Sequence, residues 1–160
     1  MNLSDEIQKV AAKYPESRSA VLPALRMAQE RHGWLSTEAL REVADALDVT
    51  PAYCKSVASF YDMFHLQPVG RHLVEVCTNV SCALVGAQQV LEAFQSELGI
   101  HAGETTEDGK FTVTMVECLG SCGTAPMMQI GFDYYENLSA EKVDEIIDKC
   151  QSGELSNGVR

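Results

Sequence analysis

Basic residues are scarce in this sequence of 160 residues: 12 lysines and arginines stand against 23 aspartates and glutamates, so the formal net charge is −11. A protein that binds nucleic acid needs a basic surface for the phosphates, and this balance argues against nucleic acid as a partner. It also disfavours docking on anionic lipid. No apolar run approaches the ~18 residues of a membrane-spanning helix, and the start MNLSDEIQKV has neither a signal-peptide nor a transit-peptide pattern. We therefore expect a cytoplasmic protein without direct membrane insertion.

Several motifs of known chemistry are also missing. The sequence contains no G-x-G-x-x-G, so a bound NADH or flavin is expected on another chain. It has no C-x-x-C dithiol of the thioredoxin type. None of its four histidines lies close enough to a cysteine to suggest the mixed ligands of a Rieske centre. No residue is therefore expected to act as catalytic acid, base or nucleophile.

The cysteines form two close pairs, and these are the candidate site. Of six cysteines, Cys77 and Cys82 form a C-x4-C motif, and Cys118 and Cys122 form a C-x3-C motif. Each pair directly follows a predicted strand, over residues 72–76 and 111–117 respectively. If these strands are neighbours in a sheet, both loops emerge at one end and the four thiols converge.

Four soft thiolates suit zinc or an iron–sulfur cluster rather than Mg²⁺ or Ca²⁺. Structural zinc sites favour shorter C-x2-C pairs, whereas wider pairs can each bind one iron of a [2Fe–2S] cluster. Spacing therefore favours the cluster and leaves a zinc-bound structural or interaction module as the alternative. Cys82, near a predicted helix start, is expected to favour the thiolate. The single cysteines Cys54 and Cys150, on predicted helices, are expected to be structural.

The hydrophobic periodicity changes from helical to strand-like near Gln67–Gly70, which predicts two domains, 1–68 and 69–160. Capping signals at Ser4, Ser36 and Thr50-Pro51 predict the starts of helices in the first domain. Another helix is predicted over residues 19–32 and closed by Gly33. The second domain is predicted to contain helices over residues 83–98 and after Ser139. Further strands are predicted over residues 127–130 and 132–135, which gives a small α/β layer fold.

Long stretches of the chain resemble one known family. These are HLVEVCTNVSCALVGA, GETTEDGKFTV and VECLGSCGTAPMMQIGFDYYENLSAEKVDEI in the second domain, and SAVLPALRMAQERHGWLS and TPAYCKSVASFYDMF in the first. They resemble the small [2Fe–2S] subunit of NADH:quinone oxidoreductase, respiratory complex I. The likeness covers about residues 4–150, and its cysteine motifs are highly specific.

The resemblance implies an α+β fold, with an N-terminal helical bundle followed by a thioredoxin-like [2Fe–2S] ferredoxin domain. It implies one [2Fe–2S] cluster ligated by Cys77, Cys82, Cys118 and Cys122, and a partner subunit that carries FMN and NADH. The chain would then accept one electron from that flavin, as an oxidoreductase and translocase subunit in the peripheral arm of a membrane-associated complex. Similar subunits occur in NAD-linked hydrogenases and formate dehydrogenases, so these remain alternative hosts, and a free shuttling ferredoxin is a further alternative.

Overall fold

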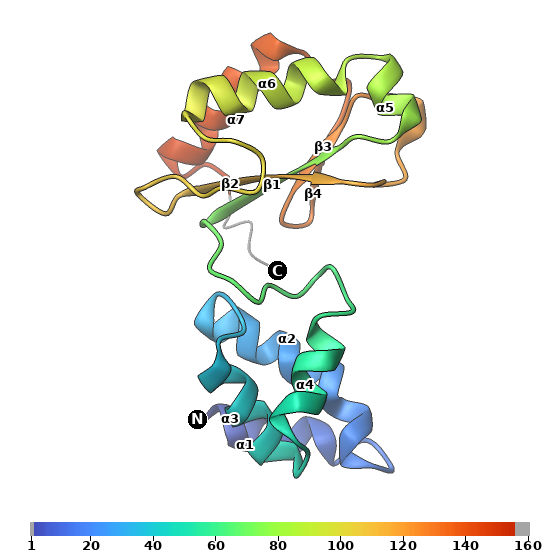
Figure 1. Cartoon of the computed structure of the whole chain (residues 1–160), viewed down its shortest axis with the longest axis vertical. Helices are drawn as coiled ribbons and strands as arrows, with labels where there is room; N and C mark the ends of the chain where they lie inside the picture. Colours follow the sequence, from blue (N-terminus) through green and yellow to red (C-terminus); the bar gives the residue numbers. More distant parts are fainter. Residues whose placement is uncertain (1, 156–160) are drawn as a thin grey trace. The chain divides into compact units, whose positions relative to one another are not determined.

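The computed structural model describes residues 2–155, which divide into two compact units, one ending at Pro68 and the other beginning at Val69. Figure 1 shows the first unit as helices and the second as a sheet with helices. The predicted combination of an N-terminal helical part and an α/β layer fold is therefore confirmed. No helix within residues 2–155 is long and apolar enough to cross a membrane.

The first unit contains α1 (Leu3–Ala11), the 3₁₀ helix η1 (Ser17–Ala20), α2 (Val21–His32), α3 (Thr37–Leu47) and α4 (Pro51–Ala58). Ser36 caps α3 by accepting a hydrogen bond from the Ala39 N–H, and Thr50 caps α4, as predicted. The predicted start of the first helix was wrong by two residues. Its cap is Asn2, whose Oδ1 accepts the Ser4 N–H at 3.2 Å, since a side-chain amide caps as well as a hydroxyl.

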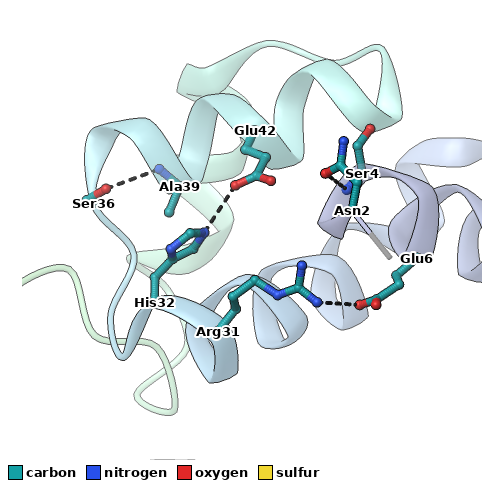
Figure 2. A network of polar contacts seen from close by, with 8 residues as sticks. All are labelled: Asn2, Ser4, Glu6, Arg31, His32, Ser36, Ala39 and Glu42. Atoms are coloured by element: carbon teal, nitrogen blue, oxygen red, sulfur yellow. Dashed lines mark hydrogen bonds and ion pairs between the residues drawn. The ribbon is translucent and has the colours of Figure 1, made fainter.

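Polar side-chain contacts connect the outer surfaces of these helices, as Figure 2 shows. Arg31 on α2 contacts Glu6 on α1 at 2.9 Å, and His32 contacts Glu42 on α3 at 3.1 Å. Such exposed pairs contribute only ~0–1 kcal/mol each, so the apolar core dominates the stability of this unit. The fully buried residues of that core include Ile7, Ala24, Leu25, Ala28, Val43, Ala44 and Cys54.

A four-stranded sheet forms the second unit, in the order β2-β1-β3-β4. Its strands are β1 (His72–Cys77), β2 (Phe111–Val116), β3 (Met128–Ile130) and β4 (Asp133–Tyr135). β1 and β2 run parallel, with Cys77 opposite Val116, whereas β3 is antiparallel to both β1 and β4. The parallel pairing of β1 and β2 is the neighbour relationship that the cysteine argument required.

Helices α6 (Ala87–Leu98) and α7 (Ala140–Ser152) lie side by side on one face of this sheet (Figure 1). Val74 and Val76 alternate along β1 and belong to the core under these helices. The apolar residues that the helices contribute are Val90, Leu91, Phe94, Val143, Ile146 and Ile147. The loops that follow β1 and β2 are therefore carried by a sheet that has one face packed against two helices.

The single helix predicted over residues 83–98 is wrong, because the chain forms two helices there. A short helix α5 (Val80–Leu84) precedes α6, and Gly86 between them has φ of +111°. That left-handed conformation interrupts a right-handed helix and is readily adopted only by glycine. Val85, between the two helices, is 54% exposed. The break gives Cys82 a five-residue helix of its own, separate from the packed helix α6.

Candidate metal centre

Both cysteine pairs lie at the carboxyl ends of the parallel strands β1 and β2. Cys77 is the last residue of β1, and Cys118 comes two residues after the end of β2. Beyond β1, the Thr78 N–H donates a hydrogen bond of 3.0 Å to the Val116 carbonyl. This bond keeps the segments that follow β1 and β2 side by side. The predicted convergence of the loops at one end of the sheet is thus confirmed.

The two pairs differ in exposure. Cys77 is 3% exposed and Cys82 is 2% exposed, whereas Cys118 and Cys122 are both exposed. The buried pair packs with Ala87 and Met127 in a small apolar cluster of its own. One half of the candidate site is therefore set into the protein, and the other half is carried on a surface loop.

Local backbone features position each pair. Asn79 caps α5 by accepting the Val80 N–H at 2.9 Å, which starts the helix that carries Cys82. Between Cys118 and Cys122, Gly120 has φ of +82°, so the chain can turn tightly there. Cys122 begins the 3₁₀ helix η2 (Cys122–Thr124), and the peptide bond from Ala125 to Pro126 is cis.

The ionisation of the buried pair is uneven. Burial alone would raise the pKa of Cys77, yet that pKa is lowered, because the backbone N–H groups of Asn79 and Leu119 hydrogen-bond to its sulfur. The thiols of Cys82 and Cys118 add to this lowering. Cys77 is therefore the buried cysteine whose thiolate the structure favours.

Burial raises the pKa of Cys82, and the neighbouring Cys77 raises it further, although the Met127 N–H opposes the change. The expectation that a helix start would favour the Cys82 thiolate was wrong: desolvation and the Cys77 thiolate dominate. The charge of Cys122 also acts on Cys82. Each buried cysteine therefore interacts with the other and with one cysteine of the exposed pair: Cys77 with Cys118, and Cys82 with Cys122.

This donor set fits an iron–sulfur cluster. Cys77 interacts with Cys82 and Cys118, and Cys82 interacts with Cys122, while the backbone N–H groups of Asn79, Leu119 and Met127 favour the thiolate forms, as in sites where such groups tune the potential. Within residues 2–155, no group of three or more His, Cys, Asp or Glu side chains is arranged so that it could hold a metal ion.

Cys54 and Cys150 lie apart from this group. Cys54 belongs to the core of the first unit, and Cys150 on α7 belongs to the core of the second. Burial raises the pKa of the Cys54 thiol, and it raises that of Cys150 to about 11. Both thiols therefore remain protonated and packed among apolar side chains.

Sequence reasoning missed two side chains that contact the exposed cysteine loop. The Tyr134 hydroxyl donates to the Leu119 carbonyl at 3.0 Å, and Glu136 accepts hydrogen bonds from the Ser121 and Thr124 hydroxyls. The one available signal was the spacing of Tyr134 and Glu136, because residues two apart in extended chain share a face. Nothing in the sequence indicated which loop that face would meet.

Fold and site together define a small α/β unit with two cysteine pairs at the carboxyl ends of two parallel strands. A family model described as thioredoxin-like [2Fe-2S] ferredoxin matches residues 7–151. The chain belongs to this family, and its cofactor is a [2Fe–2S] cluster. The thioredoxin-like fold that the resemblance implied is thereby confirmed, and the zinc alternative is set aside.

Relatives match the chain over nearly its full length. An E-type subunit of the NADH-quinone oxidoreductase of Rhizobium meliloti (strain 1021) is 45% identical, over 99% of this chain and 95% of its own. The E-type subunit of the Rickettsia conorii enzyme is 44% identical, over 95% of this chain and 91% of its own. Among solved structures, an NAD⁺-reducing [NiFe]-hydrogenase is similar with a TM-score of 0.72 and 25% identity. That match covers 81% of this chain but only 23% of the hydrogenase chain.

Proposed function

We propose that this protein is the electron-transfer subunit of an NADH:quinone oxidoreductase, which accepts one electron from the flavin of a partner subunit onto its [2Fe–2S] cluster. The observation that carries this proposal is the convergence of two cysteine pairs at the shared end of β1 and β2. Relatives named as E-type subunits of that enzyme support the choice of host complex.

The ligands follow from the two pairs. Cys77 and Cys82 would bind one iron at the buried side, and Cys118 and Cys122 would bind the other at the exposed side. Two thiolates per iron complete the four protein ligands that such a cluster needs. The exposed pair then faces outward, where a redox partner can approach closely enough for electron transfer.

The protein's own residues would bind the cluster and tune its reduction potential, and they would not catalyse a reaction themselves. When bound, the cluster stores a single electron, and this storage requires no acid, base or nucleophile from the chain. Asn79, Leu119 and Met127 direct backbone N–H groups at the sulfurs, which stabilises negative charge there. The oxidoreductase and translocase activities would belong to the whole complex, with no complete active site in this chain.

The partner is a subunit that binds FMN and NADH, because this chain has no dinucleotide-binding motif of its own. The complex would place the protein in the cytoplasm, in a peripheral arm attached to the membrane part. A second candidate host is the diaphorase module of an NAD-linked hydrogenase, favoured by the structural likeness to the NAD⁺-reducing enzyme. Formate dehydrogenase remains a further candidate host.

Spectroscopy and co-purification test this proposal together. Purified protein should contain two iron and two sulfide per chain, absorb visible light, and show an EPR signal only after reduction by dithionite. Colourless protein containing zinc would contradict the cofactor assignment. Tagged protein should co-purify with a subunit that contains FMN and binds NADH, and the remaining subunits should include quinone-reducing rather than hydrogenase components. Recovery of the free protein alone would favour a shuttling ferredoxin instead.

A further inference from the structure

The exposed cysteine loop needs support from outside itself. Cys118 and Cys122 lie at the surface, and the chain between them has no helix or strand. The buried pair, by contrast, is fixed by β1 and by the apolar cluster around Met127. An exposed loop without regular structure samples many conformations unless hydrogen bonds restrict it.

One restraint comes from β4. The Tyr134 hydroxyl donates a hydrogen bond of 3.0 Å to the carbonyl of Leu119, the residue that follows Cys118. Leu119 directly follows Cys118, so this hydrogen bond restrains the first half of the exposed loop from β4.

A second restraint comes from the residue that follows β4. Glu136 Oε1 accepts hydrogen bonds from both the Ser121 hydroxyl and the Thr124 hydroxyl, the latter at 2.5 Å. Ser121 and Thr124 stand on either side of Cys122. The two hydroxyl oxygens are also 2.8 Å apart, and the Asn137 N–H donates to the Thr124 carbonyl at 2.7 Å. The carboxylate thus joins both ends of the short segment that carries Cys122.

Tyr134 and Glu136 lie two residues apart, and both hydrogen-bond to the segment that runs from Leu119 to Thr124. Neither belongs to the ligand set. The hydroxyl hydrogen bonds lower the pKa of Glu136, so its carboxylate is ionised at neutral pH and accepts two strong bonds. A negative charge beside the exposed pair also disfavours adding an electron to a cluster held there.

We propose that Tyr134 and Glu136 are positioning residues that hold the Cys118–Cys122 loop in its cluster-binding geometry, an inference that rests on the proposed ligand set. The buried pair needs no such device, because strand and core fix it. The hairpin of β3 and β4 thereby serves the centre although it carries no ligand. Its two side chains set how tightly the exposed iron is retained and how easily the cluster is reduced.

Four single variants of the full chain, purified with their clusters, test this role. Glu136→Gln and Tyr134→Phe each remove one restraint with little change of shape. Asp108→Asn is the matched carboxylate control, since Asp108 also accepts a threonine hydroxyl, from Thr106 at 2.7 Å, outside the cysteine loops. Tyr135→Phe is the matched tyrosine control. Each protein is measured for the rate of bleaching by an iron chelator, the midpoint potential and the EPR spectrum of the reduced cluster.

Glu136→Gln and Tyr134→Phe should lose the cluster about tenfold faster than the parent protein, and both controls should stay within about twofold. The midpoint potential should become more positive in Glu136→Gln, and the EPR spectrum should change in both test variants. Parent-like bleaching rates and potentials in both would overturn the proposal. A lower melting temperature with unchanged potentials and spectra would also overturn it, because it would show general stabilisation only. Failure of the ligand assignment is distinguishable, since it would appear as full cluster content in a Cys118→Ala or Cys122→Ala variant.

Discussion

Met127 holds Cys77 in place from the segment that precedes β3: the Cys77 N–H donates a hydrogen bond of 3.2 Å to the Met127 carbonyl. The N–H of the same methionine points at the Cys82 sulfur. Its side chain is fully buried and packs against both cysteines. A single residue from the segment before β3 therefore contacts both members of the buried pair through its backbone and its side chain.

Truncating this side chain should weaken both the fold and the centre. Met127→Ala leaves a cavity beside Cys77 and Cys82, and we expect a loss of about 2–5 kcal/mol in the free energy of unfolding. Met127→Leu, which keeps the volume, should cost less than about 1.5 kcal/mol. Urea unfolding followed by circular dichroism, with cluster absorbance recorded in parallel, measures both effects. Equal behaviour of the two variants would show that the side chain does not support the pair.

The six cysteines should divide into four that bind the cluster and two that do not. Replacing Cys77, Cys82, Cys118 or Cys122 by alanine opens an iron coordination position, so the cluster should be lost or become labile. Cys54→Ala and Cys150→Ala remove packing only, at a cost of about 1–2 kcal/mol, and should keep iron, sulfide and the EPR signal. Iron and sulfide assays on the six variants decide the assignment. Cluster loss in Cys54→Ala or Cys150→Ala, with retention in one of the four, would overturn it.

Gly120 in the exposed loop and Gly123 in η2, which directly follows it, provide a matched comparison. A Cβ added at Gly120 or at Gly123 would meet no atom within 4 Å, but only Gly120 has a left-handed backbone, with φ of +82°. Gly120→Ala should therefore destabilise the loop by about 1–2 kcal/mol and speed cluster loss, whereas Gly123→Ala should stay within about 0.5 kcal/mol of the parent. Thermal unfolding and chelator bleaching measure the difference. Equal rates for the two variants would contradict a conformational requirement at Gly120.

Local signals in the sequence predicted the parts of this structure that local chemistry determines. Ser36 and Thr50 cap helices because a hydroxyl before an apolar periodic run satisfies backbone N–H groups wherever the helix lies. The placement of Cys77 and Cys118 after strands followed from alternation of apolar residues, and their convergence required only that β1 and β2 pair in parallel. These features need no knowledge of distant contacts.

The rest depends on contacts between distant residues. The N–H groups of Leu119 and Met127 reach sulfurs some 40 residues earlier in the chain, which no local pattern specifies. The same holds for Glu136, whose partners Ser121 and Thr124 lie across the hairpin. The break at Gly86 was missed for a different reason: apolar periodicity continues through it, and a glycine alone does not distinguish a kink from a tolerated interior residue.

Burial should make Cys54 and Cys150 unreactive toward thiol reagents. Desolvation raises both pKa values, that of Cys150 to about 11, so at pH 8 only about one Cys150 thiol in a thousand is ionised. Alkylation by iodoacetamide should therefore miss both residues in the folded protein and modify them once urea unfolds it, as mass spectrometry of peptides can show.

The raised pKa of Cys150 also affects stability. The folded state favours the neutral thiol, so this contribution to the free energy of unfolding is complete below the unfolded pKa of about 8.5 and is lost as pH rises toward about 11. Cys150→Ala should remove that part of the alkaline destabilisation, while Cys54→Ala serves as the comparison in the other unit. Rapid labelling of Cys150 at pH 8 without unfolding would show that the thiol is accessible and ionised, contrary to its burial on the core-facing side of α7.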